Sequence, residues 1–276
     1  MMNCQGAQLW CAATMFAVVV TVGCQRPVKV GSTDHDVDVA FLKAHMPASE
    51  VDRVGQAQLS HHADVMRTAW KGSPWQEDVD VTLWREAILP PTHVSERCED
   101  WCDVLIERLQ GVDTSGETVK QAVSTLNAAI GGTLDVHYHA TKRRAPDQGP
   151  LETMELGWSS CTGLSILLAD ACRTRGIPAR LAGTPLWVDD SGNHTWVEVW
   201  ADGQWHHVEA ADPNSWDSAW FDAKAAQAAD ETDPMHRIYA VMPSGPVVFP
   251  LAWAPERQDI HAVDVTDRYR LPTRDQ

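Results

Sequence analysis

Residues 157–212 read GWSSCTGLSILLADACRTRGIPARLAGTPLWVDDSGNHTWVEVWADGQWHHVEAAD. In this stretch a cysteine opens a predicted helix, and a histidine opens a predicted strand that turns back into a second strand followed by acidic residues. This order suggests a thiol nucleophile, its general base and an orienting carboxylate. The rest of the chain is organised around these elements.

The predicted helix begins after the serines at 159 and 160, which are residue types favoured at a helix N-cap, and ends before Gly176. Residues 164–172 are apolar on almost every side, so the helix is expected to be buried. Cys161 then lies in the first turn, where unpaired N–H groups and the helix dipole lower the pKa of a thiol. Cys161 is therefore the candidate nucleophile, the alternative being a thiol that only packs in the core, as is expected of Cys172.

A strand hairpin follows, with strands predicted at residues 179–187 and 194–200 and a tight turn at Asp202-Gly203. With a two-residue turn, positions whose numbers sum to 405 face each other, and Glu209 shares the face of His194. With a three-residue turn, Asp212 lies opposite His194 instead, because a slip of one residue exchanges the two faces. Both acids remain candidates for the orienting carboxylate.

Three motifs in this stretch resemble the transglutaminase-like superfamily: Cys161-Thr162-Gly163, RGIPAR at residues 175–180, and NHTWVEVW at 193–200 followed by a Gly-x-Trp at 203–205. The resemblance implies an α+β fold with a papain-like core, in which a buried nucleophile helix packs on an antiparallel sheet. It implies that Cys161 is the nucleophile and His194 the base. The usual aspartate of the family falls on Glu209, whereas Asp212-Pro213 matches an acid-proline pair that is frequent in a bacterial subgroup.

The N-terminus carries a targeting pattern. An apolar run from Leu9 to Val22 is too short to span a bilayer comfortably and ends at Gly23-Cys24, which resembles a bacterial lipoprotein cleavage site. We predict a signal peptide over residues 1–23, a lipid anchor on Cys24 and a tether over 24–38, with simple secretion and an uncleaved anchor as alternatives. Gln25 favours an exported protein of the cell envelope, attached to the outer membrane and facing the periplasm.

The composition narrows the choice of partners. At 276 residues the chain can bury a substantial core, and its formal charge of −16 disfavours nucleic acid as a partner. Protein or peptide substrates, including cell-envelope peptides, are expected, and no cofactor is predicted. No metal is predicted either: Cys98 and Cys102 lie four residues apart in a predicted helix and form a disulfide or pack as two thiols, since a metal site needs more ligands.

The N-terminal half reads as a helical region over residues 39–131, ahead of a catalytic core over 132–276. Thr114 and Glu117 have the spacing of a capping box, and apolar residues follow at helical spacing from Val119 to Ile130.

The expected reaction is thiol-dependent acyl transfer on an amide or peptide bond by a cysteine peptidase or amidase. A transamidase and a catalytically inactive binding module remain alternatives; hydrolysis is favoured because no calcium-site motif of the animal cross-linking enzymes is present. The oxyanion is expected on the Cys161 N–H and a side-chain amide, with Gln148 and Asn127 as candidates.

Two further expectations concern the substrate groove. By analogy with the family, Trp158 and Trp196 are expected to line it. The basic run Lys142-Arg143-Arg144 is either a solvated loop or a rim that binds a carboxylate.

Overall fold

The computed structural model describes residues 33–270. The predicted signal peptide over residues 1–23, the lipid anchor on Cys24 and the residue Gln25 lie outside this range. Among residues 33–270, every helix is too short or too polar to cross a lipid bilayer.

The first half of the described chain is helical, as predicted. Its elements are α1 (Asp34–His45), α2 (Ala48–Gly72), the short 3₁₀ helix η1 (Gln76–Asp78), α3 (Val81–Ala87), α4 (Cys102–Arg108) and α5 (Val119–Gly132). Helix α2 is kinked at Gly55, whose φ of 79° is a left-handed conformation that glycine adopts without a steric penalty.

Two predicted boundaries in this half are wrong. The tether was expected to reach Asp38, but α1 begins at Asp34, because Thr33 and Asp36 form a capping box, and Asp38 is buried against Arg67 and Arg85.

The capping box expected at Thr114 and Glu117 lies four residues later, where Thr118 caps α5 and Gln121 completes the box. Both Thr114-x-x-Glu117 and Thr118-x-x-Gln121 fit the capping-box pattern. The second directly precedes the apolar run, and the helix therefore begins there.

A six-stranded antiparallel sheet forms the second half, in the order β5-β4-β3-β6-β8-β7. Its strands are β3 (Ala179–Thr184), β4 (His194–Ala201), β5 (Gln204–Val208), β6 (Tyr239–Val241), β7 (Val247–Val248) and β8 (His261–Asp264). A separate parallel pair joins β1 (His137–Tyr138) to β2 (Trp158–Ser159). The α+β class predicted from the sequence is confirmed.

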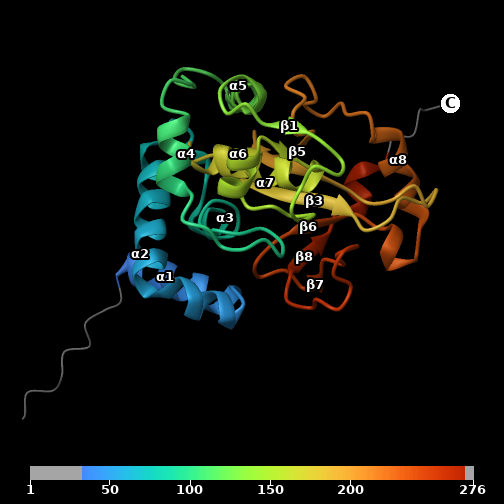
Figure 1. Cartoon of the computed structure of the whole chain (residues 1–276), viewed down its shortest axis with the longest axis horizontal. Coiled ribbons are helices and arrows are strands. Elements are labelled where there is room, and N and C mark those ends of the chain that lie inside the picture. The colour runs from blue at the N-terminus through green and yellow to red at the C-terminus, as the bar shows by residue number, and fades with distance from the viewer. Residues whose placement is uncertain (1–32, 271–276) are drawn as a thin grey trace, which may run out of the picture. The chain divides into compact units, whose positions relative to one another are not determined.

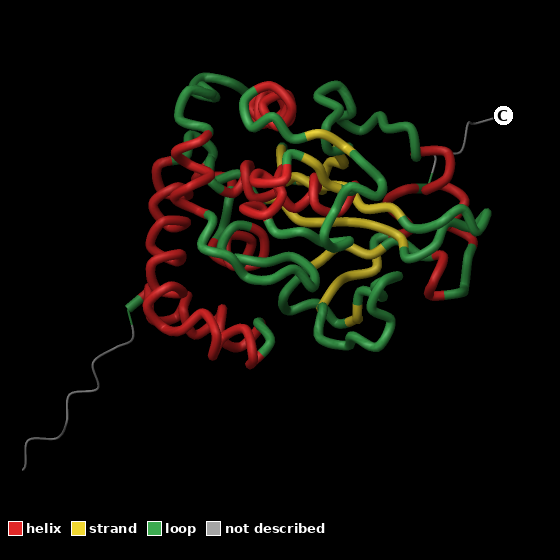
Figure 2. Tube along the Cα trace, viewed as in Figure 1, coloured by secondary structure: helices red, strands yellow, loops and turns green. Residues whose placement is uncertain are grey.

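Helix α7 (Cys161–Arg173) lies between the N-terminal helices and the sheet (Figure 1). The tube in Figure 2, viewed as in Figure 1, shows α1, α2 and α4 together at the left and the strands of the sheet to their right. Helix α7 packs against α2 and α4 as well as against β3 and β4. Every residue of α7 after Cys161 is buried, which matches the predicted apolar helix. One hydrophobic core runs from Val39 in α1 to Ala262 in β8, so the helical region and the sheet are packed as one unit.

The remaining helices are α6 (Pro150–Leu156), α8 (Asp222–Gln227) and the 3₁₀ helices η2 (Ala228–Asp230), η3 (Pro234–His236) and η4 (Thr266–Tyr269). Helix α6 precedes β2 and packs against α7. Its C-cap is Gly157, with a φ of 72°, and the chain then turns through β2 into Cys161.

The β4–β5 hairpin has the register expected of a two-residue turn. Trp200 faces Trp205 and Val197 faces Val208, so opposed positions sum to 405. Asp202 and Gly203 have φ values of 51° and 79°, which is the pair of left-handed residues that the favoured hairpin turn requires. The two-residue alternative is therefore confirmed.

Candidate active site

Cys161 is the first residue of α7 and is partly exposed. Ser160 occupies the N-cap position as predicted, but its hydroxyl donates to the Pro146 carbonyl at 2.7 Å and does not cap the helix. The backbone N–H groups of the first turn therefore have no side-chain cap, and this end of the helix favours a negative charge.

The Cys161 thiol meets strand β4. It lies next to the His194 imidazole and the backbone N–H of Thr195. Burial alone would raise the pKa of Cys161, but the hydrogen bond and the charge of His194, together with the Thr195 N–H, outweigh burial and lower it.

His194 lies between the thiol and an acid. Its Nε2 is 2.7 Å from Oε2 of Glu209, which leaves Nδ1 for the thiol. Burial alone would lower the pKa of His194, but its hydrogen bonds to Cys161 and Glu209 raise that pKa to about 9. A lowered thiol pKa beside a raised imidazole pKa favours the thiolate–imidazolium pair over the neutral pair.

The structure brings together three of the four candidate catalytic residues. Cys161, His194 and Glu209 meet, whereas Asp212 is exposed and its Oδ1 accepts from the Asn214 N–H at 3.0 Å. The two-residue hairpin turn accounts for the difference, because it keeps Glu209 on the face of His194.

Asn127 holds the turn that carries Glu209. Its Nδ2 donates to the carbonyls of Glu209 and Asp212 at 2.9 and 3.0 Å, and its Oδ1 accepts from the Ala211 N–H at 2.7 Å. Its amide is thus fully used, and the expectation that Asn127 donates to an oxyanion is wrong. A buried asparagine inside the apolar run of α5 was the sequence signal for a structural role of this kind.

Gln148 is also committed elsewhere. It is buried, its Nε2 donates to the Trp158 carbonyl at 3.1 Å, and its Oε1 accepts from the Arg144 N–H at 2.5 Å. The structure therefore gives Gln148 the role of fixing the loop before β2, in place of the expected oxyanion contact.

Aromatic rings surround the imidazole of His194, with centroids 4.8 to 6.1 Å away, from Trp187, Trp196, Trp220 and Phe221. Trp196 is fully buried and its Nε1 donates to the Tyr269 hydroxyl at 2.7 Å, so the expectation that it lines a groove is wrong. Trp220 is 61 % exposed and is the ring of this set that a substrate can touch.

Polar contacts fix the first turns of α7 on β4. Thr162 Oγ1 donates to Thr195 Oγ1 at 3.1 Å, and Ser165 Oγ donates to the Thr195 carbonyl at 3.2 Å. Gly163 faces Ser159 so closely that a Cβ there would overlap the Ser159 hydroxyl. These contacts hold the nucleophile next to the base by fixing the backbone on both sides.

The other cysteines of residues 33–270 are buried free thiols. Helix α4 begins at Cys102, so the expectation that Cys98 shares a helix with it is wrong. Cys102 instead lies near His61 and Asp103, with the ligating atoms of all three within 4.8 Å of one another. Cys102 is fully buried, and His61 is already hydrogen-bonded to Asp103 at 2.6 Å.

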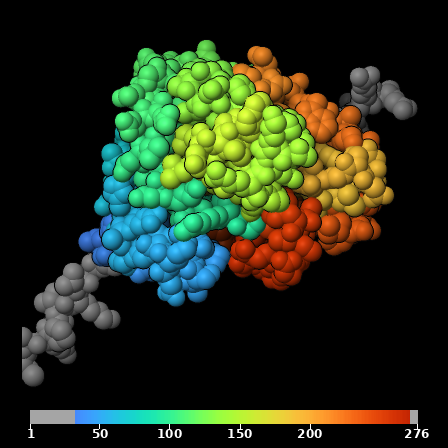
Figure 3. Space-filling model, viewed as in Figure 1, coloured from blue at the N-terminus to red at the C-terminus, as the bar shows by residue number. Residues whose placement is uncertain are grey.

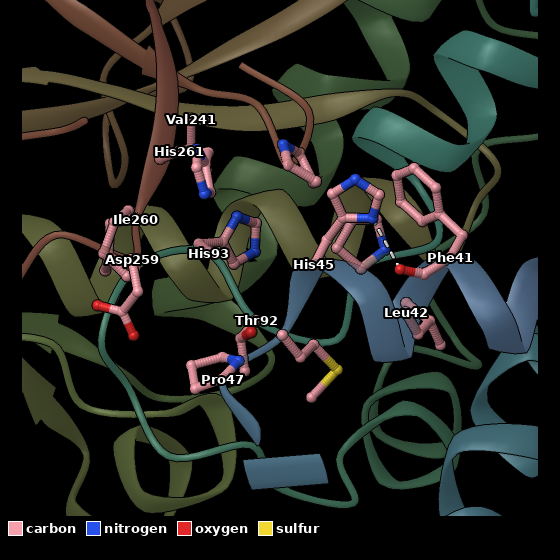
Figure 4. A pocket seen from close by; sticks show the side chains of 14 residues that line it. Phe41, Leu42, His45, Pro47, Thr92, His93, Val241, Asp259, Ile260 and His261 are labelled. Atoms are coloured by element: carbon pink, nitrogen blue, oxygen red, sulfur yellow. Dashed lines mark hydrogen bonds between the residues drawn. The ribbon is translucent and has the colours of Figure 1, made fainter. Parts of the chain in front are cut away.

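A small pocket lies apart from this site. In Figure 3 the N-terminal helices, in blue, adjoin the C-terminal strands, in red. Residues of both line a cavity of about 40 Å³, where His93 lies between His45 and His261 (Figure 4). His93 Nε2 is 2.9 Å from Oδ1 of Asp170 on α7, but Cys161, His194 and Glu209 do not line this cavity.

Part of the chain is similar to a known protein family. Residues 106–210 match the model of the transglutaminase-like superfamily, a range that contains Cys161, His194 and Glu209. Among solved structures, the chain is similar to one from Cytophaga hutchinsonii named a "Putative Cysteine Protease", with 18% identity and a TM-score of 0.39. That similarity covers 53% of this chain and 47% of the other, so the chain spans about half the length of that structure. No curated protein matches the chain.

Proposed function

We propose, from the premise that residues 106–210 form a transglutaminase-like domain, that this protein is a cysteine hydrolase of amide or peptide bonds. The observation that carries the proposal is the position of His194, which lies next to the Cys161 thiol on one side and is hydrogen-bonded to the Glu209 carboxylate on the other. A thiol, an imidazole and a carboxylate in this order form an activated nucleophile.

In the first half of the proposed reaction, the Cys161 thiolate attacks the carbonyl carbon of the amide. The electron pair of the carbonyl moves to oxygen, and the N–H groups at the start of α7 stabilise the resulting charge. The His194 imidazolium then gives its proton to the amide nitrogen as the C–N bond breaks. An amine leaves, and a thioester remains on Cys161.

In the second half, neutral His194 takes a proton from water, and the resulting hydroxide attacks the thioester. The carboxylic acid leaves, and the thiolate and imidazolium are restored. Glu209 keeps the imidazole oriented and stabilises its charged form throughout. An amine in place of water would give a transamidase, so product analysis with and without added glycine methyl ester decides between transfer and hydrolysis.

The proposal is tested by the rate of alkylation of Cys161 with iodoacetamide between pH 5 and 10, measured by peptide mass spectrometry. The thiolate–imidazolium pair exists between the lowered pKa of Cys161 and the pKa of His194, which is about 9. We therefore expect an inflection of the labelling rate below the pH of ~8.5 at which an ordinary thiol titrates. In His194→Ala the inflection should return to the pH of an ordinary thiol, and labelling below that pH should be slow.

His261→Ala is the matched control, because His261 lies on β8 beside the separate pocket and should leave the profile unchanged. The buried thiols of Cys98, Cys102 and Cys172 serve as slow internal references. Slow labelling of Cys161 in both wild type and His194→Ala, without an inflection below pH ~8, would overturn the enzyme proposal and leave a binding module.

The role of Glu209 has its own test. Glu209→Gln is expected to lower kcat/KM for an amide substrate by about 10² to 10⁴-fold. The neutral amide does not stabilise the positive charge of the imidazolium and does not orient the imidazole correctly. Asp212→Asn is the matched control and should stay within about twofold of wild type, as usual for an exposed side chain without a partner in the site. The reverse result would assign the third position to Asp212 and show that the hairpin has a different register in solution.

We further propose that the reaction takes place in the cell envelope, on protein or peptide substrates. The apolar run that ends at Gly23-Cys24 supports this location. In a bacterial host fed a labelled fatty acid, the full chain should incorporate the label and fractionate with the outer membrane, and Cys24→Ala should lose both properties. Equal labelling of Cys24→Ala would exclude the predicted anchor.

A further inference from the structure

The loop of residues 139–148 is hydrogen-bonded to the three residues that precede Cys161. The His139 N–H donates to the Ser159 carbonyl at 2.8 Å, and the Gln148 amide donates to the Trp158 carbonyl at 3.1 Å. Between these two points, the Pro146 carbonyl accepts from the Ser160 hydroxyl at 2.7 Å. Residues 139–148 are therefore attached at several places to the segment that leads to Cys161.

The tip of this loop carries two exposed cations. Lys142 and Arg143 are exposed, and neither forms an ion pair with any residue in the range 33–270. Their neighbour Arg144 differs, since it pairs with Glu152 at 3.4 Å and with Glu155 at 3.1 Å. Two adjacent positive charges thus remain available at this place.

Trp158 sets the position of one of these cations. The Lys142 ammonium lies 4.6 Å from the centre of the Trp158 ring, and the backbone N–H groups of Thr141 and Lys142 donate to His139 Nδ1. A cation over an indole face is attracted to it and loses part of its freedom. Because Trp158 is three residues before Cys161, this contact holds Lys142 against the segment that leads to the nucleophile.

The net charge of the chain bears on what the two cations, Lys142 and Arg143, can bind. With a formal charge of −16, the protein repels anions over most of its surface. The loop tip is an exception beside the segment that precedes Cys161, and Tyr138, which comes just before the loop in the sequence, is an aromatic residue that is 58 % exposed. An anionic group would be attracted to the surface here.

We propose that Lys142 and Arg143 form a subsite that binds a carboxylate of the substrate beside the Cys161 thiol. The inference rests on the proposed function, because it assigns the substrate class as amides or peptides that carry a carboxylate close to the bond to be cleaved. Arginine and lysine both bind carboxylates, the first in a forked geometry and the second as a point charge.

The subsite can be tested without a substrate. Iodoacetate and iodoacetamide have nearly the same shape, and in both the thiolate displaces iodide, but only iodoacetate carries a carboxylate. The ratio of their rate constants at Cys161 therefore reports the positive charge around the thiol. Both rate constants are measured on the same thiol, so a change in its ionised fraction cancels in the ratio.

We expect the iodoacetate-to-iodoacetamide ratio to fall by about three- to tenfold in the double variant Lys142→Met with Arg143→Met, and to fall in the wild type as salt is added. Lys71→Met is the control for charge, because Lys71 is exposed near the end of α2, which packs against the C-terminal end of α7, away from Cys161. An unchanged ratio in the double variant, or an equal fall in Lys71→Met, would overturn the subsite.

This outcome is separable from failure of the proposed function. If His194 does not activate the thiol, both reagents label slowly, yet their ratio still reports the charge. Where the carboxylate comes from is decided with peptide substrates that differ only in Glu against Gln, or in a free against an amidated C-terminus. A preference for either acid in the wild type that is lost in the double variant supports the subsite, and no preference for either contradicts it.

Discussion

Cys161→Ala is expected to lower kcat/KM for amide hydrolysis by about 10⁵ to 10⁶-fold, as removal of a nucleophile does in enzymes that act through a covalent intermediate. The expectation follows from the geometry, since Cys161 is the cysteine that His194 contacts and that stands at the uncapped start of α7. The measurement is turnover of the best substrate from a screen of peptide amides, with the folded fraction checked by circular dichroism.

Cys172→Ala is the matched control, because Cys172 lies on the same helix. Its side chain is fully buried, and burial raises the pKa of its thiol to about 12. Losing it should cost about 1 kcal/mol of stability through the small cavity that remains, and should leave kcat/KM near the wild-type value. Turnover that survives in Cys161→Ala and disappears in Cys172→Ala would move the nucleophile to the other thiol.

The largest expected effect on stability comes from Glu198. Its carboxylate is buried and accepts hydrogen bonds from Arg180 at 2.9 Å, Arg268 at 2.6 and 2.7 Å, and the Tyr269 hydroxyl at 2.9 Å. Glu198→Ala should destabilise the fold by about 3–5 kcal/mol, because it leaves the buried Arg180 guanidinium without a counter-charge. Urea unfolding measures this directly.

Lys224→Met is the control for Glu198, because the pair of Lys224 and Asp189 is partly exposed and should be worth at most about 1 kcal/mol. The contribution of Glu198 also depends on pH. Burial alone would raise the pKa of Glu198, but Arg180 and Arg268 outweigh burial and lower it below 4.5. The stabilisation should therefore be present above pH 4.5 and be lost as the pH falls through the lowered pKa. A difference below about 1 kcal/mol at pH 7 would show that water reaches Arg180 in the variant.

The elements that were predicted correctly are those with a local signal. The apolar run predicted helix α7, and Asp202-Gly203 predicted a tight turn. The length of that turn then sets the face of the hairpin on which Glu209 lies. The choice between Glu209 and Asp212 needed the length of the turn, which several residue patterns allow. The turn in the structure has two residues, which excludes the arrangement with Asp212 opposite His194.

Three of the errors at the site share one cause, which is competition from partners distant in the sequence. The Ser160 hydroxyl is drawn to Pro146, and Trp196 is buried by Tyr269 from the end of the chain. Asn127 is used by a turn more than 80 residues away. The local sequence around these residues does not indicate their partners, so their roles could not be predicted from the sequence.

The spacing between the Asp202-Gly203 turn and Glu209 limits how this chain can change over evolutionary time. A residue added within the turn would only lengthen an exposed loop, a kind of change that folds commonly tolerate, because Ala201 can still face Gln204. A residue added or lost between Gln204 and Glu209 would instead move the glutamate to the other face of the strand, away from the imidazole, although every residue of the site was retained. Homologues with intact cysteine, histidine and glutamate but a different spacing here would thus be expected to have lost the role of the glutamate, so this spacing is as diagnostic as the residues themselves.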